Sequence, residues 1–316
     1  MKHLLCCCVW LISINAAVAQ SDLKYYDYNW KPCPPEQARF LSESVKTDSG
    51  YYHRDYFIHE KSLQMAGLYM DAEGKIRHGQ FYYFHPNKNI ESFGKYREGK
   101  KHGLWLSYHN SGMMEDSTWY DNGEPVGISM SWWPNGTPHD SIHYNPDGTA
   151  VHVSWFDNGA PAAAGRYVMK KIPVGKWQYF HMNGKLSALK TYANGQVTES
   201  LLYDEDGNLM PIGADRDRDA EFPGGSTGWT KYVRKNVFFP DKFVITNADQ
   251  AVVVVSFSVD ADGNVGDAWV STPFYPEFDR IALKAVQNAP KWKPAIRHNR
   301  RIKTWYRQAI TFTQPD

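Results

Sequence analysis

Residues 102–123 read HGLWLSYHNSGMMEDSTWYDNG, and this phrase recurs along the chain. A glycine stands 24 residues after Gly103, at Gly127, and another 48 residues further on, at Gly175. Self-similarity at a fixed period of this size is typical of repeat architectures, in which each unit packs only against its neighbours. We therefore expect residues 67–208 to form a repeat array rather than a domain around one central core.

Each unit has the pattern of a β-hairpin. An aromatic stretch runs into a turn such as Asn-Ser-Gly at 110–112 or Met-Asn-Gly at 182–184, and a second stretch closes near a tyrosine. Asn and Gly accept the positive φ that tight turns require. Because a single hairpin is marginally stable, we expect stacked hairpins whose rings form the core. The candidate repeat-core residues are Phe81, Trp105, Tyr108, Tyr120, Trp132, Tyr144, Trp155, Tyr167, Trp177 and Tyr192.

These units resemble MORN-type repeats, in the bacterial variant with the phrase G-x-W-x-x-Y-x-x-N-G … Y-x-x-G. The third and fourth units depart from the phrase, because Ser129 and Val153 stand near the expected Trp column. The resemblance implies a mainly β array that contacts proteins or lipids, and it identifies no partner.

The pattern changes after residue 221. The stretch STGWTKYVRKNVFFP, 226–240, has helical spacing and ends at a proline, and a second apolar helical stripe follows at 278–289. Strands are indicated at 251–259, 265–271 and 301–312, with the turn Asp-Ala-Asp-Gly between the first two. Together these stretches favour an α+β domain, a three-stranded antiparallel sheet backed by two helices.

Residues 222–316 resemble the carboxyl-terminal domain of TonB. The matching stretches, in chain order, are FPGG, FFP, VVVSFSVDADGNV, FDRIALKAV, APKWKPA and a closing strand that ends in ITF. The glycine common before the first strand of that family is absent from NADQAVVV. TonB domains capture a short segment of outer-membrane receptors by strand addition, so the resemblance implies binding of an extended peptide.

A basic stretch leads into the last strand. No acid stands between Lys291 and Arg307, whereas Lys and Arg are frequent there. A strand edge offers unpaired N–H and C=O groups to an extended peptide, and a basic flank favours an acidic one. The alternative is a charged edge that only discourages aggregation. The peptide-binding candidates are Arg300, Arg301, Lys303, Trp305 and Arg307.

No constellation of catalytic or metal-binding residues accompanies these features. His-Glu-x-x-His, a phosphate loop and a dinucleotide fingerprint are all missing from the sequence. The net charge of +1 gives no overall attraction to nucleic acid. We therefore predict a protein that is not an enzyme, has no cofactor or metal, and has no nucleic-acid partner.

Residues 1–19 have the pattern of a signal peptide. Lys2 precedes a mostly apolar stretch, and Ala17-Val18-Ala19 is a typical cleavage site. We expect cleavage after Ala19, a location in the periplasm or cell envelope, and only indirect contact with a membrane. Residues 20–66 carry no pattern that assigns them, and residues 209–221 have the composition of a linker.

Together the patterns predict a non-enzymatic cell-envelope protein of a Gram-negative bacterium. The array would be a scaffold or interaction surface, and the TonB-like domain would bind an extended peptide of an outer-membrane or envelope partner, with a link to transmembrane transport. Two alternatives remain open: an energy transducer of the TonB type that keeps an amino-terminal anchor, and a repeat module that binds lipid or glycan surfaces. Homodimerisation is left open.

Overall fold

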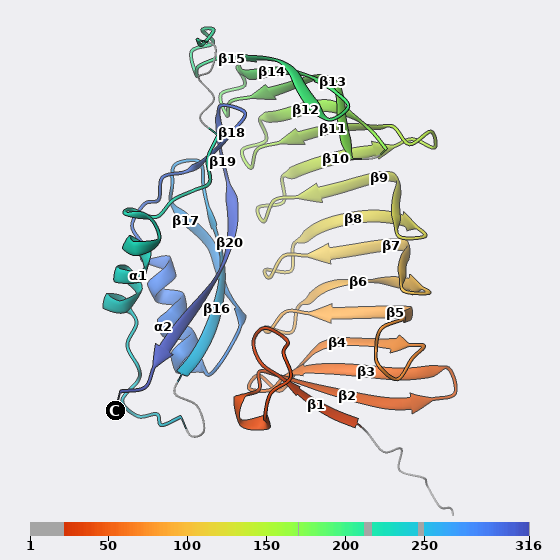
Figure 1. The fold of residues 1–316 in the computed structure, drawn as a ribbon, viewed down its shortest axis with the longest axis vertical. Coiled ribbons are helices and arrows are strands. Elements are labelled where there is room, and N and C mark those ends of the chain that lie inside the picture. The colour runs from red at the N-terminus through yellow and green to blue at the C-terminus, as the bar shows by residue number, and fades with distance from the viewer. Residues whose placement is uncertain (1–21, 170, 212–216, 246–249, 316) are drawn as a thin grey trace, which may run out of the picture.

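The structure, a computed structural model, describes residues 22–169, 171–211, 217–245 and 250–315. It has two parts, a long sheet that we call the array and a smaller α+β domain that we call the small domain (Figure 1). The predicted signal peptide and its cleavage site lie outside the described residues. Within them, no helix is both long and apolar enough to cross a membrane.

The array is one antiparallel sheet of 15 strands in which every strand pairs with the next one in the chain. Its short connections keep all pairings local, as the repeated turn residues predicted. A short 3₁₀ turn, η1 (Pro35–Gln37), lies between its first two strands. The strands are β1 (Asp22–Tyr26), β2 (Phe40–Thr47), β3 (Gly50–Phe57), β4 (Ser62–Tyr69), β5 (Arg77–Phe84), β6 (Ile90–Arg97), β7 (Lys100–Tyr108), β8 (Met114–Asp121), β9 (Glu124–Trp132), β10 (Pro138–Tyr144), β11 (Ala150–Trp155), β12 (Pro161–Val168), β13 (Ile172–Phe180), β14 (Leu186–Ala193) and β15 (Gln196–Leu202).

The sheet begins well before the first recognisable repeat. Strands β1 to β4 occupy most of the segment 20–66, which carried no pattern in the sequence. Their pairing continues without a break into the repeats, since β4 pairs with β5. The amino-terminal segment is therefore the first part of the same sheet.

Aromatic rings on one face of the array form its core. Tyr69 meets Phe81 edge to face at 5.3 Å, Tyr96 meets Phe81 at 5.0 Å, and Tyr96 meets Trp105 at 4.9 Å. Edge-to-face contacts between rings stabilise a structure beyond the area that they bury. Each ring therefore links two neighbouring units, and the sheet needs no second layer behind it.

The candidate repeat-core residues differ in burial. Phe81, Trp105 and Trp177 are buried, and the other seven are half-buried: Tyr108, Tyr120, Trp132, Tyr144, Trp155, Tyr167 and Tyr192. Next to Trp132 and Trp155, the buried rings are Trp133 and Phe156. In these two units the buried ring is therefore one residue after the predicted core residue, at the start of the turn.

The small domain has the predicted fold class, which is confirmed. Its sheet has the order β17-β16-β20, and two helices cover one face (Figure 1). A core of Val253, Val255, Phe257, Phe278 and Ile310 lies between the sheet and α2. The elements are α1 (Gly225–Asn236), β16 (Gln250–Val259), β17 (Val265–Thr272), α2 (Pro276–Gln287), a two-stranded ribbon of β18 (Ala295–Arg297) and β19 (Arg300–Ile302), and β20 (Thr304–Thr313).

The small domain lies beside one row of hairpin turns of the array, with its helices on the side away from them (Figure 1). The central strand β16 is buried over most of its length, although one of its faces carries no helix. The segment between the two parts also pairs with the small domain, because Arg218 bridges Ile296 and Glu221 bridges Lys293. Residues 217–221 of the predicted linker are thus fixed to the domain that they precede.

Candidate functional site

Five turns on one side of the array each begin with a residue on the side of the small domain. These residues, which we call the turn column, follow the ends of β5, β7, β9, β11 and β13. In each case the backbone N–H closes the turn by donating to a carbonyl four residues later. The turn column consists of His85, His109, Trp133, Phe156 and His181.

Side chains of the turn column bind the next unit of the array. His85 donates from Nε2 to the carbonyl of Tyr108 at 2.9 Å, and His109 does the same to Trp132 at 2.8 Å. The Nε1 of Trp133 donates to the carbonyl of Trp155 at 3.0 Å. Because a carbonyl only accepts, the bonded nitrogen of each histidine carries the hydrogen. These histidines therefore stabilise the stacking of the units.

The small domain offers the outer face of its sheet to these turns. Trp305 lies opposite Ser258, and Ser256 lies between Arg307 on one side and Trp269 on the other. Residues directly opposite in antiparallel strands share a face. Two indoles therefore stand on either side of a floor that carries only small hydroxyl side chains.

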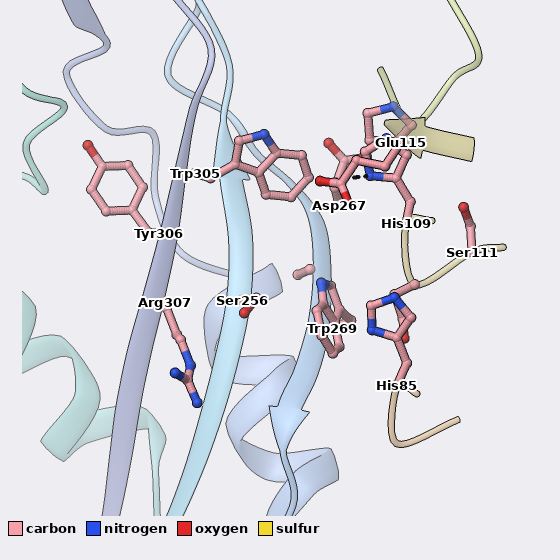
Figure 2. Close-up of a pocket in the computed structure, with 13 residues that line it drawn as sticks. His85, His109, Ser111, Glu115, Ser256, Asp267, Trp269, Trp305, Tyr306 and Arg307 are labelled. Carbon is pink, nitrogen blue, oxygen red and sulfur yellow. Dashed lines mark ion pairs between the residues drawn. The ribbon is translucent and has the colours of Figure 1, made fainter. Parts of the chain in front are cut away.

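A cleft of about 520 Å³ lies between this face and the part of the turn column that contains His85 and His109 (Figure 2). On the array side it is lined by His85, His109 and Glu115, and on the small-domain side by Trp269, Trp305 and Arg307, among others. The ring of His85 meets Trp269 edge to face at 5.0 Å and joins the two walls. A cleft of this volume is in the usual range for a small-molecule site.

A backbone irregularity positions the acidic group of the cleft. The register between β16 and β17 shifts next to Asp267, whose φ of 45° lies in the left-handed region. Such a bulge re-aims a side chain, and here the carboxylate accepts from Ser258 at 2.8 Å and pairs with Lys303 at 2.8 Å. Burial alone would raise the pKa of Asp267, but the Lys303 and Ser258 hydrogen bonds hold it below its ordinary value.

Three of the five peptide-binding candidates contact the array. Arg300 donates to the carbonyl of Ala162 and lies over the rings of Phe156 and Tyr179, each at 5.3 Å. Burial lowers the pKa of Arg300 to about 10, although Tyr179, Asp217 and Asp140 oppose this effect. This guanidinium is therefore part of the contact between the two parts.

Arg301 and Lys303 form ion pairs with acidic residues, and one acidic partner of each belongs to the array. Arg301 lies 2.9 Å from Glu205 and 3.4 Å from Asp262. Lys303 joins the array to the small domain, because it pairs with Asp157 at 3.4 Å as well as with Asp267. The basic stretch found in the sequence thus lies largely between the two parts.

The remaining two candidates, Trp305 and Arg307, line the cleft. Trp305 is 45% exposed, whereas Arg307 donates to the hydroxyl of Thr272 at 3.0 Å. Both stand on β20, which pairs only with β16 among the described strands. The outer edge of β20 therefore has no strand beside it in the described part of the chain.

The turn column was not identified as a site from the sequence. His85 and His109 were visible there only as one repeat position occurring twice, and the buried Trp133 and Phe156 replace histidine in the next two units. The recurrence of histidine at His181 was the signal that could have marked the column. Among the described residues, no group of three or more His, Cys, Asp or Glu side chains could hold a metal ion.

Comparison with known families supports the division into two parts. Residues 236–313 match the family model "Gram-negative bacterial TonB protein C-terminal", and residues 173–194 match the model "MORN repeat variant". Both resemblances predicted from the sequence are confirmed over these ranges, and both families are non-catalytic. No curated protein matches the chain.

Proposed function

We propose that this is a non-enzymatic protein of the Gram-negative cell envelope that binds an extended peptide of an outer-membrane or envelope partner by strand addition. The peptide would pair with the outer edge of β20, and the array would hold the small domain in place. The free edge of β20 is the observation that carries this proposal. The similarity of residues 236–313 to the TonB C-terminal region supports it.

The position of the array also favours β20 over the other edge of the sheet. The array approaches β17 and the loop that follows it, where His85 contacts Trp269 and the guanidinium of Arg39 lies 4.1 Å from the ring centre of Phe274. A peptide adding to β17 would have to displace these contacts. Main-chain hydrogen bonds give affinity in strand addition, so the edge that needs no displacement is favoured.

Contacts at both ends of the small domain favour a scaffolding role for the array. Arg39 and His59 touch the loop after β17, while Arg300 and Arg301 contact residues near the other end of the sheet. An energy transducer of the TonB type would need an anchor and freedom of the small domain to move. The array contacts support the binding protein over that alternative.

Two neighbouring proline substitutions on β20 test the proposal in the full chain. Successive N–H groups of a strand point to opposite edges, so one of Gln308→Pro and Ala309→Pro removes an N–H facing β16 and the other an N–H facing outward. Proline is tolerated in an edge strand where its missing N–H would face solvent. We expect one variant to keep the free energy of unfolding within about 1 kcal/mol of the unsubstituted chain and to lose peptide binding.

Hydrogen–deuterium exchange gives the direct readout. The full chain would be mixed with a panel of ten-residue segments from outer-membrane receptors and with scrambled versions of each. Protection of residues 304–313 by some segments but not by their scrambled versions is the expected result. Unchanged exchange in β20 with every segment would contradict strand addition there.

A further inference from the structure

The cleft beside the turn column has features that strand addition at β20 does not use. The bound strand would lie at the edge of the sheet, whereas the cleft lies over its face and extends to Trp269 on the far strand. Two walls from distant parts of the chain enclose it, the turns of β5–β6 and β7–β8 on one side and the small sheet on the other (Figure 2). The cleft is therefore a separate candidate site.

The array wall presents hydrogen-bond acceptors. His85 is only 5% exposed, and its Nε2 donates to the Tyr108 carbonyl. In the neutral ring the other nitrogen, Nδ1, is then an acceptor, and it is buried without a hydrogen-bond partner among the described residues. His109 also donates from Nε2, to the Trp132 carbonyl, but its Nδ1 lies 3.9 Å from Glu115, whose carboxylate oxygens are further acceptors of this wall. A buried acceptor without a partner is costly, so a ligand that donates a hydrogen bond to His85 would be favoured.

The small-domain wall presents flat apolar surface and hydroxyls. The indole of Trp269 lies opposite Ser256 and that of Trp305 opposite Ser258, and Trp305 is 45% exposed although it is a large apolar ring. Arg307 adds a donor beside them. An indole offers a wide apolar face to whatever stacks on it, so this wall fits a ligand with an apolar face and a polar rim.

The charged groups around the cleft limit which class of ligand fits it. The carboxylate of Asp267 is already paired with Lys303, and Lys303 also lies 5.9 Å from the centre of the Trp305 ring. A second cation at that ring would be repelled by the first. An anion would instead meet the acceptors of His85, His109 and Glu115. A neutral ligand rich in hydroxyl donors satisfies both walls.

We propose that this cleft binds a segment of a neutral glycan. A pyranose ring has an apolar face of C–H groups that stacks on an indole, and its hydroxyls can donate to Nδ1 of His85 and accept from Arg307. The volume of about 520 Å³ is in the range of sites that enclose a small ligand. Because each wall comes from a different part of the chain, the site exists only when the small domain is seated on the array.

Isothermal titration calorimetry on the full chain tests this with four probes: cellotetraose, maltotetraose, xylotetraose and N-acetylated chitotetraose. We expect saturable binding of at least one probe, weakened tenfold or more by Trp305→Ala and by His85→Phe. Trp119→Ala is the matched control, because Trp119 is a similarly exposed tryptophan, at 54%, on β8 of the array and does not line the cleft. The control is expected to bind as the unsubstituted chain does.

Three results would contradict the glycan proposal. Absence of binding for all four probes up to 10 mM would overturn the proposal, as would an equal loss from Trp119→Ala and Trp305→Ala. Binding of tetralysine in place of the saccharides would show a cation site instead. His85→Phe also removes the hydrogen bond to the Tyr108 carbonyl, so this variant could lose binding because it is destabilised. The Trp305 side chain makes no hydrogen bond in the described structure. Trp305→Ala therefore tests the cleft without removing such a bond. Peptide protection at β20 is measured separately and does not depend on these results.

Discussion

The indole of Trp105 on β7 lies against the α-carbon of Gly94 on the neighbouring strand β6. A Cβ added at Gly94 would come within 2.3 Å of the ring. The same relationship joins Phe81 to Gly67 and Trp177 to Gly165, where the corresponding distances are 2.3 Å and 2.0 Å. These glycines leave the space in which each large ring is buried against a sheet that has only one layer.

Gly94→Ala is therefore expected to destabilise the array by about 1–3 kcal/mol, the usual cost of overpacking. The added methyl group would force the Trp105 ring away from its contact with Tyr96. Urea unfolding followed by circular dichroism gives the difference in free energy. Gly266→Ala is the control, since its added Cβ would have Ser258 Oγ at 3.4 Å as its nearest neighbour. Equal midpoints for Gly94→Ala and the unsubstituted chain would contradict the role of the glycine.

Arg300→Ala is expected to loosen the small domain from the array. The guanidinium bonds to carbonyls of Ala162 and Phe180 and lies over two rings, and hydrogen bonds to a charged group contribute about 1.5–3 kcal/mol. Arg300→Lys keeps the charge but loses the planar fork, so we expect only partial recovery. Limited proteolysis of residues 203–224 and thermal unfolding would show the change, and identical cleavage rates for all three proteins would rule this contact out as a clamp.

The stability of the chain is expected to fall between about pH 4 and pH 7 because of Asp279. Burial raises its pKa to about 7, with repulsion from Glu60, while the Phe274 N–H and Arg39 oppose the shift. The carboxyl holds its proton more tightly in the folded chain than in the unfolded chain, where its pKa is near 3.8. Its stabilising effect is thus present at low pH and is lost as pH rises through the folded value.

Asp279→Asn should flatten that dependence by at most about 4 kcal/mol, because one pKa unit corresponds to about 1.36 kcal/mol. Urea midpoints at pH 5 and pH 8 for the variant and the unsubstituted chain give the comparison. Asp55, whose pKa burial raises to about 6, acts in the same direction and remains in both proteins. Parallel pH profiles for the two proteins would exclude Asp279 as the source.

Arg301→Ala is expected to change the affinity for an edge-binding peptide by less than twofold. Its guanidinium is directed to Glu205 and Asp262, away from the free edge of β20. Of Gln308→Pro and Ala309→Pro, the variant that removes the outward N–H of β20 should weaken the same peptide at least fivefold. Fluorescence polarisation with a labelled segment that protects β20 measures both, and the reverse order of effects would contradict the proposed position of the peptide.

The mature protein is expected to begin at Gln20. Cleavage after Ala19 would remove residues 1–19 and release the chain into the periplasm. Mass spectrometry of the protein recovered from the envelope fraction gives the amino-terminal residue. A chain that retains residues 1–19 would instead support the anchored alternative.

Local pattern was enough to predict both architectures. The 24-residue spacing from Gly103 to Gly127 marks hairpins whose pairings are all between neighbours. The stripe that includes Phe278 and Ile281 likewise predicted a helix, and both side chains are buried beneath it. Each of these signals lies within a few residues of the contact that it describes.

The assembly of the two parts could not be predicted in this way. Arg300 contacts the backbone carbonyl of Ala162, which is 138 residues away in the chain, and every residue type offers such a carbonyl. The sequence shows that the stretch 291–307 is basic, but composition does not tell which acids lie opposite it. Only the relative placement of array and small domain shows that Arg301 and Lys303 have partners, and that placement also creates the cleft.

The contacts at the two ends of the small domain have a further consequence for the array. Arg39 touches the small domain near the start of the sheet, and Arg300 reaches Ala162 on β12, so the small domain spans the units between them. Repeat arrays commonly gain and lose units by duplication and deletion. Here an extra or missing hairpin between β3 and β12 would separate one of these pairs by the width of two strands, about 9.5 Å. The small domain thus measures the distance between these two contacts and fixes the number of hairpins that lie between them.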